Sequence, residues 1–290
     1  AGMKHFLIAT NFIKDENLQL TFKVERYIAE HGGSTTKITG QEGNYAEHIS
    51  DVLENDRRFD CVIALGGDGT ILKVSRDLRK WNLPIVGVNL GTLGFLAEIE
   101  PEQIYPVLDR LLQDDYEIEE RMNICGSIYK KGQEEPLRCD VALNDIVVSR
   151  AGFSRVIGLR VYVNGRVMDN YEADGLIVST PTGSTGYNLS AGGPIVSPRT
   201  NVMIITPISP HSLTSKSIVL GNSDEIVVEV LKMRKAQEEE AIVNFDGQPG
   251  TQLSAGDRIV IHKAEQTTKM LKLFDVSFYE VLREKMANHL

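Results

Sequence analysis

The first third of the chain alternates short apolar runs with segments of helical periodicity. Phe6–Ala9 is an apolar run of strand length, and apolar residues then recur at helical spacing from Leu20 to Ile28, before Gly32 and Gly33. The stretch from Tyr45 to Leu53 repeats the helical spacing. This alternation predicts a strand followed by helices.

A second strand and helix are predicted around a glycine-rich turn. Cys61–Leu65 is a continuous apolar run of the kind that is buried in a parallel sheet, and Gly66–Thr70 follows it directly. Apolar positions from Ile71 to Leu78 have helical spacing, and Ile85–Val88 supplies another strand. The pattern predicts an α/β domain with a Rossmann-like parallel sheet.

From about residue 123 the pattern changes to short strand-like segments, and helical periodicity nearly disappears. Asn164-Gly165 lies between alternating residues, which is a strong signal for a β-hairpin. We therefore predict an all-β second domain. Its expected strands are Cys125–Tyr129, Val141–Val148, Val156–Val163, Leu176–Ser179, Val202–Thr206, Ile226–Leu231, Ala241–Phe245 and Ile259–His262.

Helical spacing returns at the end of the chain, where apolar residues from Phe278 to Met286 share one face. We expect this tail helix to return to the first domain. The predicted α/β domain thus covers residues 1–122 with 274–290, and the β-rich domain covers residues 123–273. Gln237–Glu240 is expected to form an exposed acidic loop.

Composition supports an ordinary globular protein. The 290 residues are 42% hydrophobic and 24% charged, and the formal net charge is -9 without a dense basic stripe, so we expect no nucleic-acid partner. The three cysteines, Cys61, Cys125 and Cys139, are too irregularly spaced for a disulfide framework or a zinc site. No apolar run approaches the ~20 residues that cross a bilayer, and no secretory signal is visible, so we expect a cytoplasmic protein without membrane association.

The turn Gly66–Thr70 has the composition of a phosphate-binding loop. It lies between a buried strand and a helix start, where free N–H groups and the helix dipole bind anions. Asp68 is the informative residue, because a carboxylate beside a phosphate is unfavourable unless it receives a proton, orients a hydroxyl or holds a metal. Each option indicates phosphoryl transfer; the alternative is an ordinary tight turn with Asp68 as a helix cap.

A second segment, Asp174–Pro194, is rich in glycine and hydroxyl groups and follows a strand directly. Its small donors and acceptors surround Tyr187, whose ring offers a flat face for a base, so the segment suits a nucleotide-like ligand. A flexible linker is the alternative.

Two other kinds of chemistry are disfavoured. A serine-hydrolase elbow would require glycine at position 182, where the residue is Thr182. The six histidines are scattered without the spacing of metal ligands, so we expect no built-in metal site.

Four segments together resemble the NAD kinase family. Gly66–Thr70 matches the family's Gly-Gly-Asp-Gly-Thr motif, and Asn89 with Leu93–Leu96 matches the loop after the next strand. Leu143–Asp145 matches the Asn-Glu/Asp motif, and Asp174–Pro194 matches the long glycine-rich motif. The first motif alone is shared with lipid kinases, whereas four in the right order are specific.

The resemblance implies a reaction and its partners. Family members transfer the terminal phosphate of ATP, in bacterial members sometimes of polyphosphate, to the 2′-hydroxyl of the adenosine ribose of NAD, forming NADP. It also implies Mg²⁺ or another divalent cation, bound chiefly through the ATP phosphates. Family members are usually homodimers or homotetramers, and their fold matches the pattern described above.

Residue roles follow by matching position. The resemblance makes Asp68 the residue that orients and deprotonates the 2′-hydroxyl. It assigns ATP phosphates to Gly66, Gly67, Gly69 and Thr70, ribose hydroxyls to Asn144 and Asp145, a pocket wall near the adenine to Phe95, and other dinucleotide contacts to Asp174, Thr182, Thr185, Gly186, Tyr187 and Ser190.

Some of these residues have structural alternatives. Asn144-Asp145 is also compatible with an Asx turn at a strand end, and Phe95 with a core position. Asp246-Gly247-Gln248 resembles a family segment, but a hairpin turn explains it equally well.

Two other functions compete with the family's reaction. A lipid or sugar kinase could share the Gly-Gly-Asp-Gly turn, but it would require an apolar membrane-facing patch or an arginine cluster, and neither is evident. A non-catalytic nucleotide sensor has no need for Asp68 beside a phosphate, and the presence of this carboxylate favours an enzyme.

Overall fold

The computed structural model describes residues 2–38, 52–54, 58–151, 156–233 and 240–288. Most of the helix expected from Tyr45 to Leu53 lies outside these residues. Of the acidic loop expected at Gln237–Glu240, residues 237–239 lie outside them as well, and Glu240 is the first residue of a strand.

The chain divides into two compact units. Unit 1 contains residues 1–120 and 268–290, and unit 2 contains residues 121–267. Unit 2 is therefore inserted into unit 1. The chain leaves unit 1 at the end of β5 (Glu117–Arg121) and re-enters it at the start of β18 (Thr268–Lys272).

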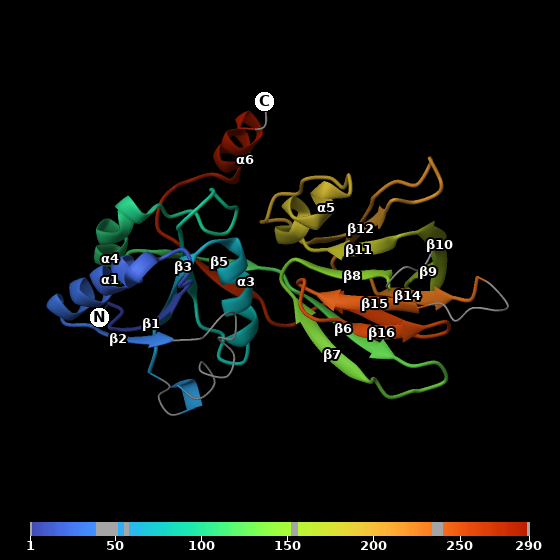
Figure 1. The fold of residues 1–290 in the computed structure, drawn as a ribbon, viewed down its shortest axis with the longest axis horizontal. Coiled ribbons are helices and arrows are strands. Elements are labelled where there is room, and N and C mark those ends of the chain that lie inside the picture. The colour runs from blue at the N-terminus through green and yellow to red at the C-terminus, as the bar shows by residue number, and fades with distance from the viewer. Residues whose placement is uncertain (1, 39–51, 55–57, 152–155, 234–239, 289–290) are drawn as a thin grey trace. The chain divides into compact units, whose positions relative to one another are not determined.

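Unit 1 is built on a six-stranded sheet with the order β2-β1-β3-β4-β18-β5 (Figure 1). The pairs β1–β2, β1–β3, β3–β4 and β4–β18 are parallel, as predicted for an α/β domain. The strands are β1 (His5–Thr10), β2 (Ser34–Ile38), β3 (Cys61–Gly66), β4 (Ile85–Asn89), β5 (Glu117–Arg121) and β18 (Thr268–Lys272). The helices are η1 (Glu16–Leu18), α1 (Gln19–Glu30), α3 (Asp68–Asp77), η2 (Pro101–Gln103), α4 (Ile104–Leu112) and α6 (Phe278–Ala287).

Alternation along the central strands determines which helix covers which face. Phe6, Ile8 and Ile63 share a buried cluster with apolar residues of α1 and α4. On the other face, a Cβ added to Gly87 would lie 2.2 Å from Cδ1 of Ile71 in α3, so glycine allows this helix to pack closely on β4. Helices thus cover both faces of the sheet.

The tail helix returns to unit 1, as expected. Ser277 caps α6 by accepting the N–H of Glu280 at 3.2 Å, and the Glu280 carboxylate accepts the N–H of Ser277. The Phe278 ring lies 5.7 Å from the Phe95 ring, and Nζ of Lys285 lies 5.0 Å from the Phe95 centroid. These contacts place α6 against the loop that follows β4.

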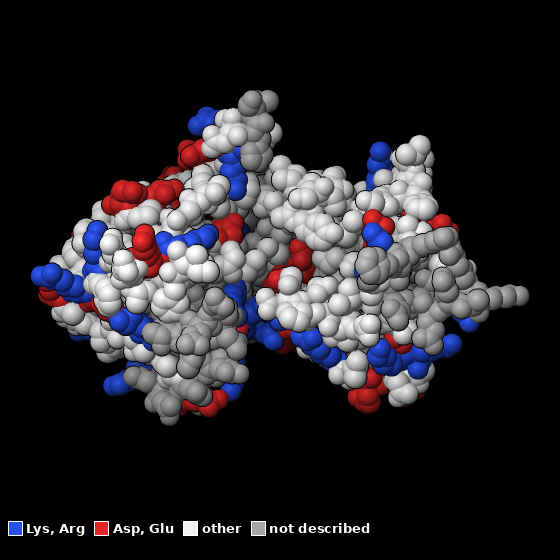
Figure 2. Space-filling view, viewed as in Figure 1, with Lys and Arg blue, Asp and Glu red and all other residues white. Residues whose placement is uncertain are grey.

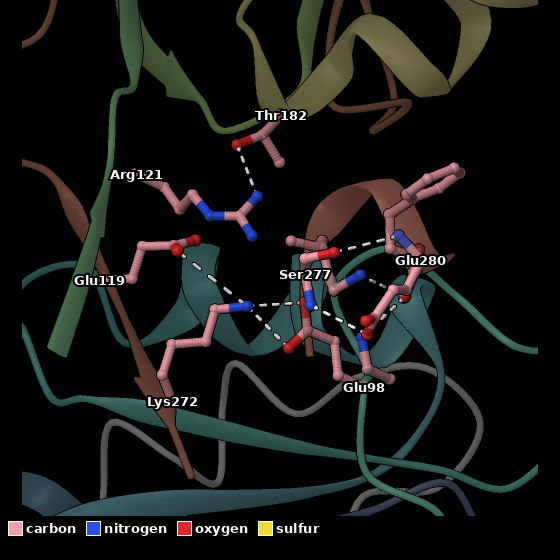
Figure 3. A network of polar contacts seen from close by, with 11 residues as sticks. Glu98, Glu119, Arg121, Thr182, Lys272, Ser277 and Glu280 are labelled. Carbon is pink, nitrogen blue, oxygen red and sulfur yellow. Dashed lines mark hydrogen bonds and ion pairs between the residues drawn. The ribbon is translucent and has the colours of Figure 1, made fainter. Parts of the chain in front are cut away.

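An ion-pair cluster joins the strands through which the chain leaves and re-enters unit 1. Lys272 of β18 binds both carboxylate oxygens of Glu98 at 2.6 and 2.7 Å, and Glu119 of β5 lies 4.0 Å away (Figure 3). All three side chains are at least four-fifths buried.

Unit 2 consists of two six-stranded sheets, with the orders β10-β9-β14-β17-β6-β7 and β13-β12-β11-β8-β15-β16. Apolar residues from both sheets form one buried cluster, so the prediction of an all-β second domain is confirmed. The strands are β6 (Ile124–Tyr129), β7 (Arg138–Ala142), β8 (Asp145–Arg150), β9 (Ile157–Val163), β10 (Arg166–Ala173), β11 (Gly175–Ser179), β12 (Val202–Ile208), β13 (Ile218–Gly221), β14 (Ile226–Leu231), β15 (Glu240–Phe245), β16 (Thr251–Ser254) and β17 (Arg258–Lys263).

Two details of unit 2 bear on the sequence predictions. Asn164 and Gly165 have φ angles of 51° and 79° between β9 and β10, so the predicted hairpin turn is confirmed. The single strand expected over Val141–Val148 is wrong, because β7 and β8 belong to different sheets and the chain changes sheet at residues 143–144.

Surface charge and helix length fit the composition. On the visible face of unit 1, acidic and basic side chains are interspersed (Figure 2). None of the helices in the described ranges combines the length and the apolar character that crossing a bilayer demands.

Candidate functional site

The predicted phosphate loop lies at the carboxyl end of β3 and opens α3. A Cβ on Gly66 would lie 2.2 Å from Oγ1 of Thr70, so only glycine fits there. The first N–H of α3 that bonds back is that of Ile71, to the Gly67 carbonyl at 3.1 Å. The N–H groups of Asp68, Gly69 and Thr70 therefore precede the helical ladder, and Gly69 has open space around it. This arrangement suits an anion.

Asp68 holds the loop that follows β4. Its Oδ2 accepts the N–H of Phe95 at 2.9 Å, and its Oδ1 accepts those of Leu96 and Ala97 at 3.1 and 3.0 Å. A Cβ on Gly94 would lie 2.0 Å from Oδ1, so glycine at that position makes room for the carboxylate. Asp68 is thus a structural anchor as well as a candidate catalytic group, which the sequence motif did not indicate.

Asn89, at the end of β4, pairs with Gly66 of β3 and is 2% exposed. Its Oδ1 accepts the N–H of Gly91 at 3.1 Å, whereas its Nδ2 has no hydrogen-bond partner. A buried donor without an acceptor costs about 1–3 kcal/mol, so the carboxyl edge of the sheet carries an uncompensated donor.

Phe95, expected to form a pocket wall, is partly buried in unit 1. Its ring contacts Phe278 and Lys285 of the tail helix, as described above. The tail therefore contributes to the surroundings of this residue, a contribution that sequence spacing alone did not predict.

In unit 2, Asp246 organises the candidate ribose-binding residues. Its carboxylate accepts the backbone N–H groups of Leu143, Asn144 and Asp145 at 2.8, 2.7 and 3.2 Å. These three N–H groups bind a side chain and not a neighbouring strand, which explains why the chain changes sheet at residues 143–144. The sequence left Asp246 as an equally plausible hairpin residue; its φ of 51° agrees with a turn, and its carboxylate adds a long-range role.

Asn144 and Asp145 place two polar side chains next to each other in a buried setting. Oδ1 of Asn144 is buried without a hydrogen bond. Asp145 is 7% exposed, and burial, followed by the neighbouring charge of Asp246, raises the pKa of its carboxyl group to about 7. Two adjacent acceptors of this kind fit the hydroxyl groups of a ribose.

The glycine-rich segment packs on these residues. It forms η3 (Thr182–Thr185) and α5 (Tyr187–Ser190). The N–H of Thr180 bonds to the Asn144 carbonyl at 2.9 Å, and a Cβ on Gly183 would lie 2.0 Å from that oxygen. The linker interpretation is therefore wrong, and the segment is built against Asn144.

The predicted contacts in this segment differ in exposure. Thr182 is buried, and its Oγ1 accepts a hydrogen bond from the guanidinium of Arg121, which is also a buried residue, at 3.2 Å (Figure 3). Gly186, Tyr187 and Ser190 are exposed, and Thr185 is half-buried. Arg121 has no counterpart among the residues expected from the sequence, because its contact joins positions 61 residues apart.

Asp174 lies apart from the other predicted dinucleotide contacts. It precedes β11, whose far end leads to Thr180 and Thr182, so the five-residue strand separates them by roughly 17 Å. Oδ1 of Asp174 lies 3.3 Å from Nε of Arg150. Gly186 lies near the Asn144 side chain, since a Cβ there would lie 3.9 Å from its Nδ2, whereas Asp174 lies at the other end of β11.

A metal site built by the protein itself would require several His, Cys, Asp or Glu side chains close together in the described part of the chain. Within that part of the chain, no group of three or more His, Cys, Asp or Glu side chains is arranged to hold a metal ion.

Comparisons with known proteins give the same family for the N-terminal and the C-terminal part of the chain. The family model for the ATP-NAD kinase N-terminal domain matches residues 6–116, and the model for the ATP-NAD kinase C-terminal domain matches residues 143–273. An NAD kinase of Lachnoclostridium phytofermentans is 46% identical over 289 residues, covering 99% of this chain and 100% of that protein. An NAD kinase of Agathobacter rectalis is 42% identical over 287 residues, with the same coverage.

Solved structures agree in fold. Yeast NADH kinase complexed with NADH has a TM-score of 0.86 at 23% identity, covering 99% of this chain and 88% of that chain. An NAD kinase from Archaeoglobus fulgidus in complex with ATP has a TM-score of 0.75 at 27% identity, covering 98% of both chains. The expected combination of an α/β domain, an all-β domain and a C-terminal helix is confirmed.

Proposed function

The chain belongs to the NAD kinase family, and on this premise we propose that it transfers the terminal phosphate of ATP to the 2′-hydroxyl of the adenosine ribose of NAD, forming NADP. In this step the hydroxyl oxygen bonds to the γ-phosphorus, the bond to the bridging oxygen breaks, and ADP leaves. The hydroxyl proton passes to a carboxylate.

The observation that carries the proposal is the position of Asp68 directly after two glycines at the end of β3. Its Oδ2 accepts a single N–H, so one lone pair is free to accept the proton of a hydroxyl group. Phosphoryl transfer depends mainly on alignment and charge stabilisation, so one positioned carboxylate suffices to orient the attacking hydroxyl and to take its proton.

The remaining roles are part of the same proposal. The backbone at Gly66, Gly67, Gly69 and Thr70 would bind ATP phosphates, and Asn144 and Asp145 would accept hydrogen bonds from ribose hydroxyls. Phe95 would line the adenine pocket, and Thr182, Thr185, Gly186, Tyr187, Ser190 and, more remotely, Asp174 would contact the dinucleotide.

The cofactor, location and assembly belong to the proposal as well. A divalent cation, Mg²⁺, would arrive on the ATP phosphates and neutralise part of their charge. A cytoplasmic location rests on the sequence pattern and on the three free cysteines, which suit a reducing compartment, whereas a homodimeric or homotetrameric assembly rests on the family resemblance.

The test is formation of NADP from NAD, ATP and Mg²⁺, measured with an NADP-specific dehydrogenase. Asp68→Asn should lower turnover at least ~10²-fold, the effect typical of removing a general base, with NAD affinity largely kept. Asp77→Asn, the same change at the other end of α3, is the matched control and should leave turnover near that of the wild type.

Because the amide introduced by Asp68→Asn would meet three N–H donors, thermal unfolding of both variants must show that they are folded. A folded wild type that makes no NADP overturns the function. Full turnover in Asp68→Asn overturns the role of that carboxylate.

A further inference from the structure

The residues proposed above for ATP carry no positive charge. They contribute backbone N–H groups, one hydroxyl and the negative Asp68, whereas a triphosphate brings several negative charges. Phosphoryl transfer is helped by a cation at the oxygens of the transferring and leaving groups. A cationic side chain at the carboxyl edge of the sheet in unit 1 would supply that charge.

Lys14 lies beside the phosphate loop. Its Nζ is 3.1 Å from the position that a Cβ on Gly67 would take, and 3.5 Å from the corresponding position on Gly91. The ammonium group thus lies over two glycines, one in the phosphate loop and one in the loop after β4. A phosphate bound to the backbone at Gly67 would be within reach of a hydrogen bond from Nζ.

The turn that carries Lys14 is fixed at its first residue. The N–H of Asn11 bonds to the Leu65 carbonyl at the end of β3 at 2.8 Å. The Asn11 side chain accepts the N–H groups of Ile13 and Lys14 at 3.0 and 3.3 Å, and its carbonyl accepts those of Lys14 and Asp15. The backbone of Lys14 is therefore tied to the strand that ends in the phosphate loop.

The turn is also fixed at its last residue. The buried carboxylate of Asp15 accepts the N–H groups of Leu20 and Thr21, both at 2.9 Å, and the Thr21 hydroxyl at 2.7 Å. The start of α1 therefore holds residue 15 in place. A turn fixed at both ends holds the Lys14 backbone in place, so the binding of its side chain to a phosphate would require no ordering of the loop.

The Lys14 side chain is available to bind a ligand. It is exposed, and no carboxylate of the described residues forms an ion pair with it. A lysine without an internal partner can bind phosphate without first breaking a salt bridge.

A second group at the same edge also lacks an acceptor. Nδ2 of Asn89 is buried without a partner, and Asn89 pairs in register with Gly66. The ends of β1, β3 and β4 lie side by side, because Thr10 pairs with Leu65 and Gly66 with Asn89. Cationic and donor groups thus converge on one edge of the sheet.

We propose that Lys14 is a phosphate-binding residue that donates to the β- and γ-phosphate oxygens of ATP and supplies the protein's positive charge in the transfer step. This inference rests on the proposed function. It adds a residue that lies outside the four motifs used to recognise the family.

The test compares Lys14→Met with Lys23→Met, which removes another exposed lysine, from α1. Lys14→Met should lower kcat/KM for ATP about 10- to 100-fold, the range for loss of a charge-assisted hydrogen bond, and leave the KM for NAD near the wild-type value. Lys14→Arg should recover most of the loss, and Lys23→Met should behave as the wild type.

A second readout is independent of turnover. ATP with Mg²⁺, without NAD, should raise the melting temperature of the wild type and Lys23→Met, and raise it clearly less for Lys14→Met. Equal kinetics and equal protection by ATP in Lys14→Met and Lys23→Met would overturn the inference. Absence of NADP from the wild type would overturn the proposed function instead, while ATP protection would still decide the role of Lys14.

Discussion

At the scale of residues, the carboxylates of three aspartates accept backbone N–H groups from segments that lie elsewhere in the sequence. Asp15 binds the first turn of α1, Asp68 binds residues 95–97, and Asp246 binds residues 143–145. Carboxylates that accept several N–H groups fix a loop more firmly than a single hydrogen bond can. Two of the three, Asp68 and Asp246, hold segments that contain predicted site residues.

Asp145 gives a prediction about pH. Its pKa is raised to about 7, mainly by burial and also by the charge of Asp246, whereas an aspartate in an unfolded chain titrates near 3.9. Between about pH 4 and 7 the folded chain keeps a proton that the unfolded chain has lost, so the contribution of this residue to stability falls as the pH rises. Asp145→Asn should remove this contribution.

The measurement is the melting temperature of Asp145→Asn minus that of the wild type. This difference should grow between pH 4 and pH 8 by at least ~2–4 °C, the shift that 1 kcal/mol produces in a protein of 150–250 residues. Asp275→Asn, at an exposed position, is the control and should show no such trend. A difference that stays constant with pH would contradict the prediction.

At the scale of elements, the glycine-rich segment offers a matched pair of substitutions. A Cβ on Gly183 would lie 2.0 Å from the Asn144 carbonyl oxygen, which is backbone and cannot move aside cheaply. A Cβ on Gly186 would meet nothing closer than 3.4 Å. Gly183→Ala should destabilise unit 2 by about 1–3 kcal/mol, the cost of overpacking, and Gly186→Ala should be close to neutral.

Denaturant unfolding of the two variants checks this prediction. If Gly183→Ala unfolds at the same midpoint as Gly186→Ala, η3 is not seated on Asn144 as described. A loss of NAD affinity in Gly183→Ala alone would also support the proposed role of Asn144.

The elements that were predicted correctly from the sequence are marked by patterns of neighbouring residues. The strand, glycine turn and helix at residues 61–78 and the hairpin at Asn164-Gly165 each depend on residues adjacent in sequence. Helix α4 is missing from the sequence predictions, although its buried positions, Ile104, Val107, Leu108 and Leu111, have helical spacing. In contrast, the break between β7 and β8 depends on Asp246, about 100 residues away, and no local pattern carries that information.

The same distinction applies to the candidate site. Motif order pointed to Asp68, Asn144 and Asp145. It did not indicate that Asp68 anchors residues 95–97, that Arg121 contacts Thr182, or that Asp174 lies at the other end of β11. These facts follow from strand pairing and from long-range contacts, which are not readable from spacing.

At the scale of the whole molecule, the insertion of unit 2 predicts how fragments behave. The apolar cluster of unit 2 is formed entirely by residues between Met122 and Ile261, so residues 121–267 alone should fold and unfold cooperatively. Residues 1–120 alone should not reach the native sheet, because β18, which lies between β4 and β5, is missing. Thermal unfolding followed by circular dichroism tests both, with the full chain as reference.

A cooperative transition in residues 1–120 would contradict this expectation, as would its absence in residues 121–267. Adding residues 268–290 as a separate peptide offers a further check. Binding of the peptide to residues 1–120 should restore structure, because it supplies the missing strand.

The position of β18 also has a consequence for synthesis on the ribosome. Strand β5 emerges before the 147 residues of unit 2, and its sheet neighbour β18 emerges after them. At about 5–20 residues per second, β5 has no native neighbour for roughly 7–30 s. During that time nascent unit 1 has an incomplete sheet, so the inserted unit can complete its fold first. Chaperones that bind nascent chains would then find exposed apolar surface in the first 120 residues, and release would come only with the last 23.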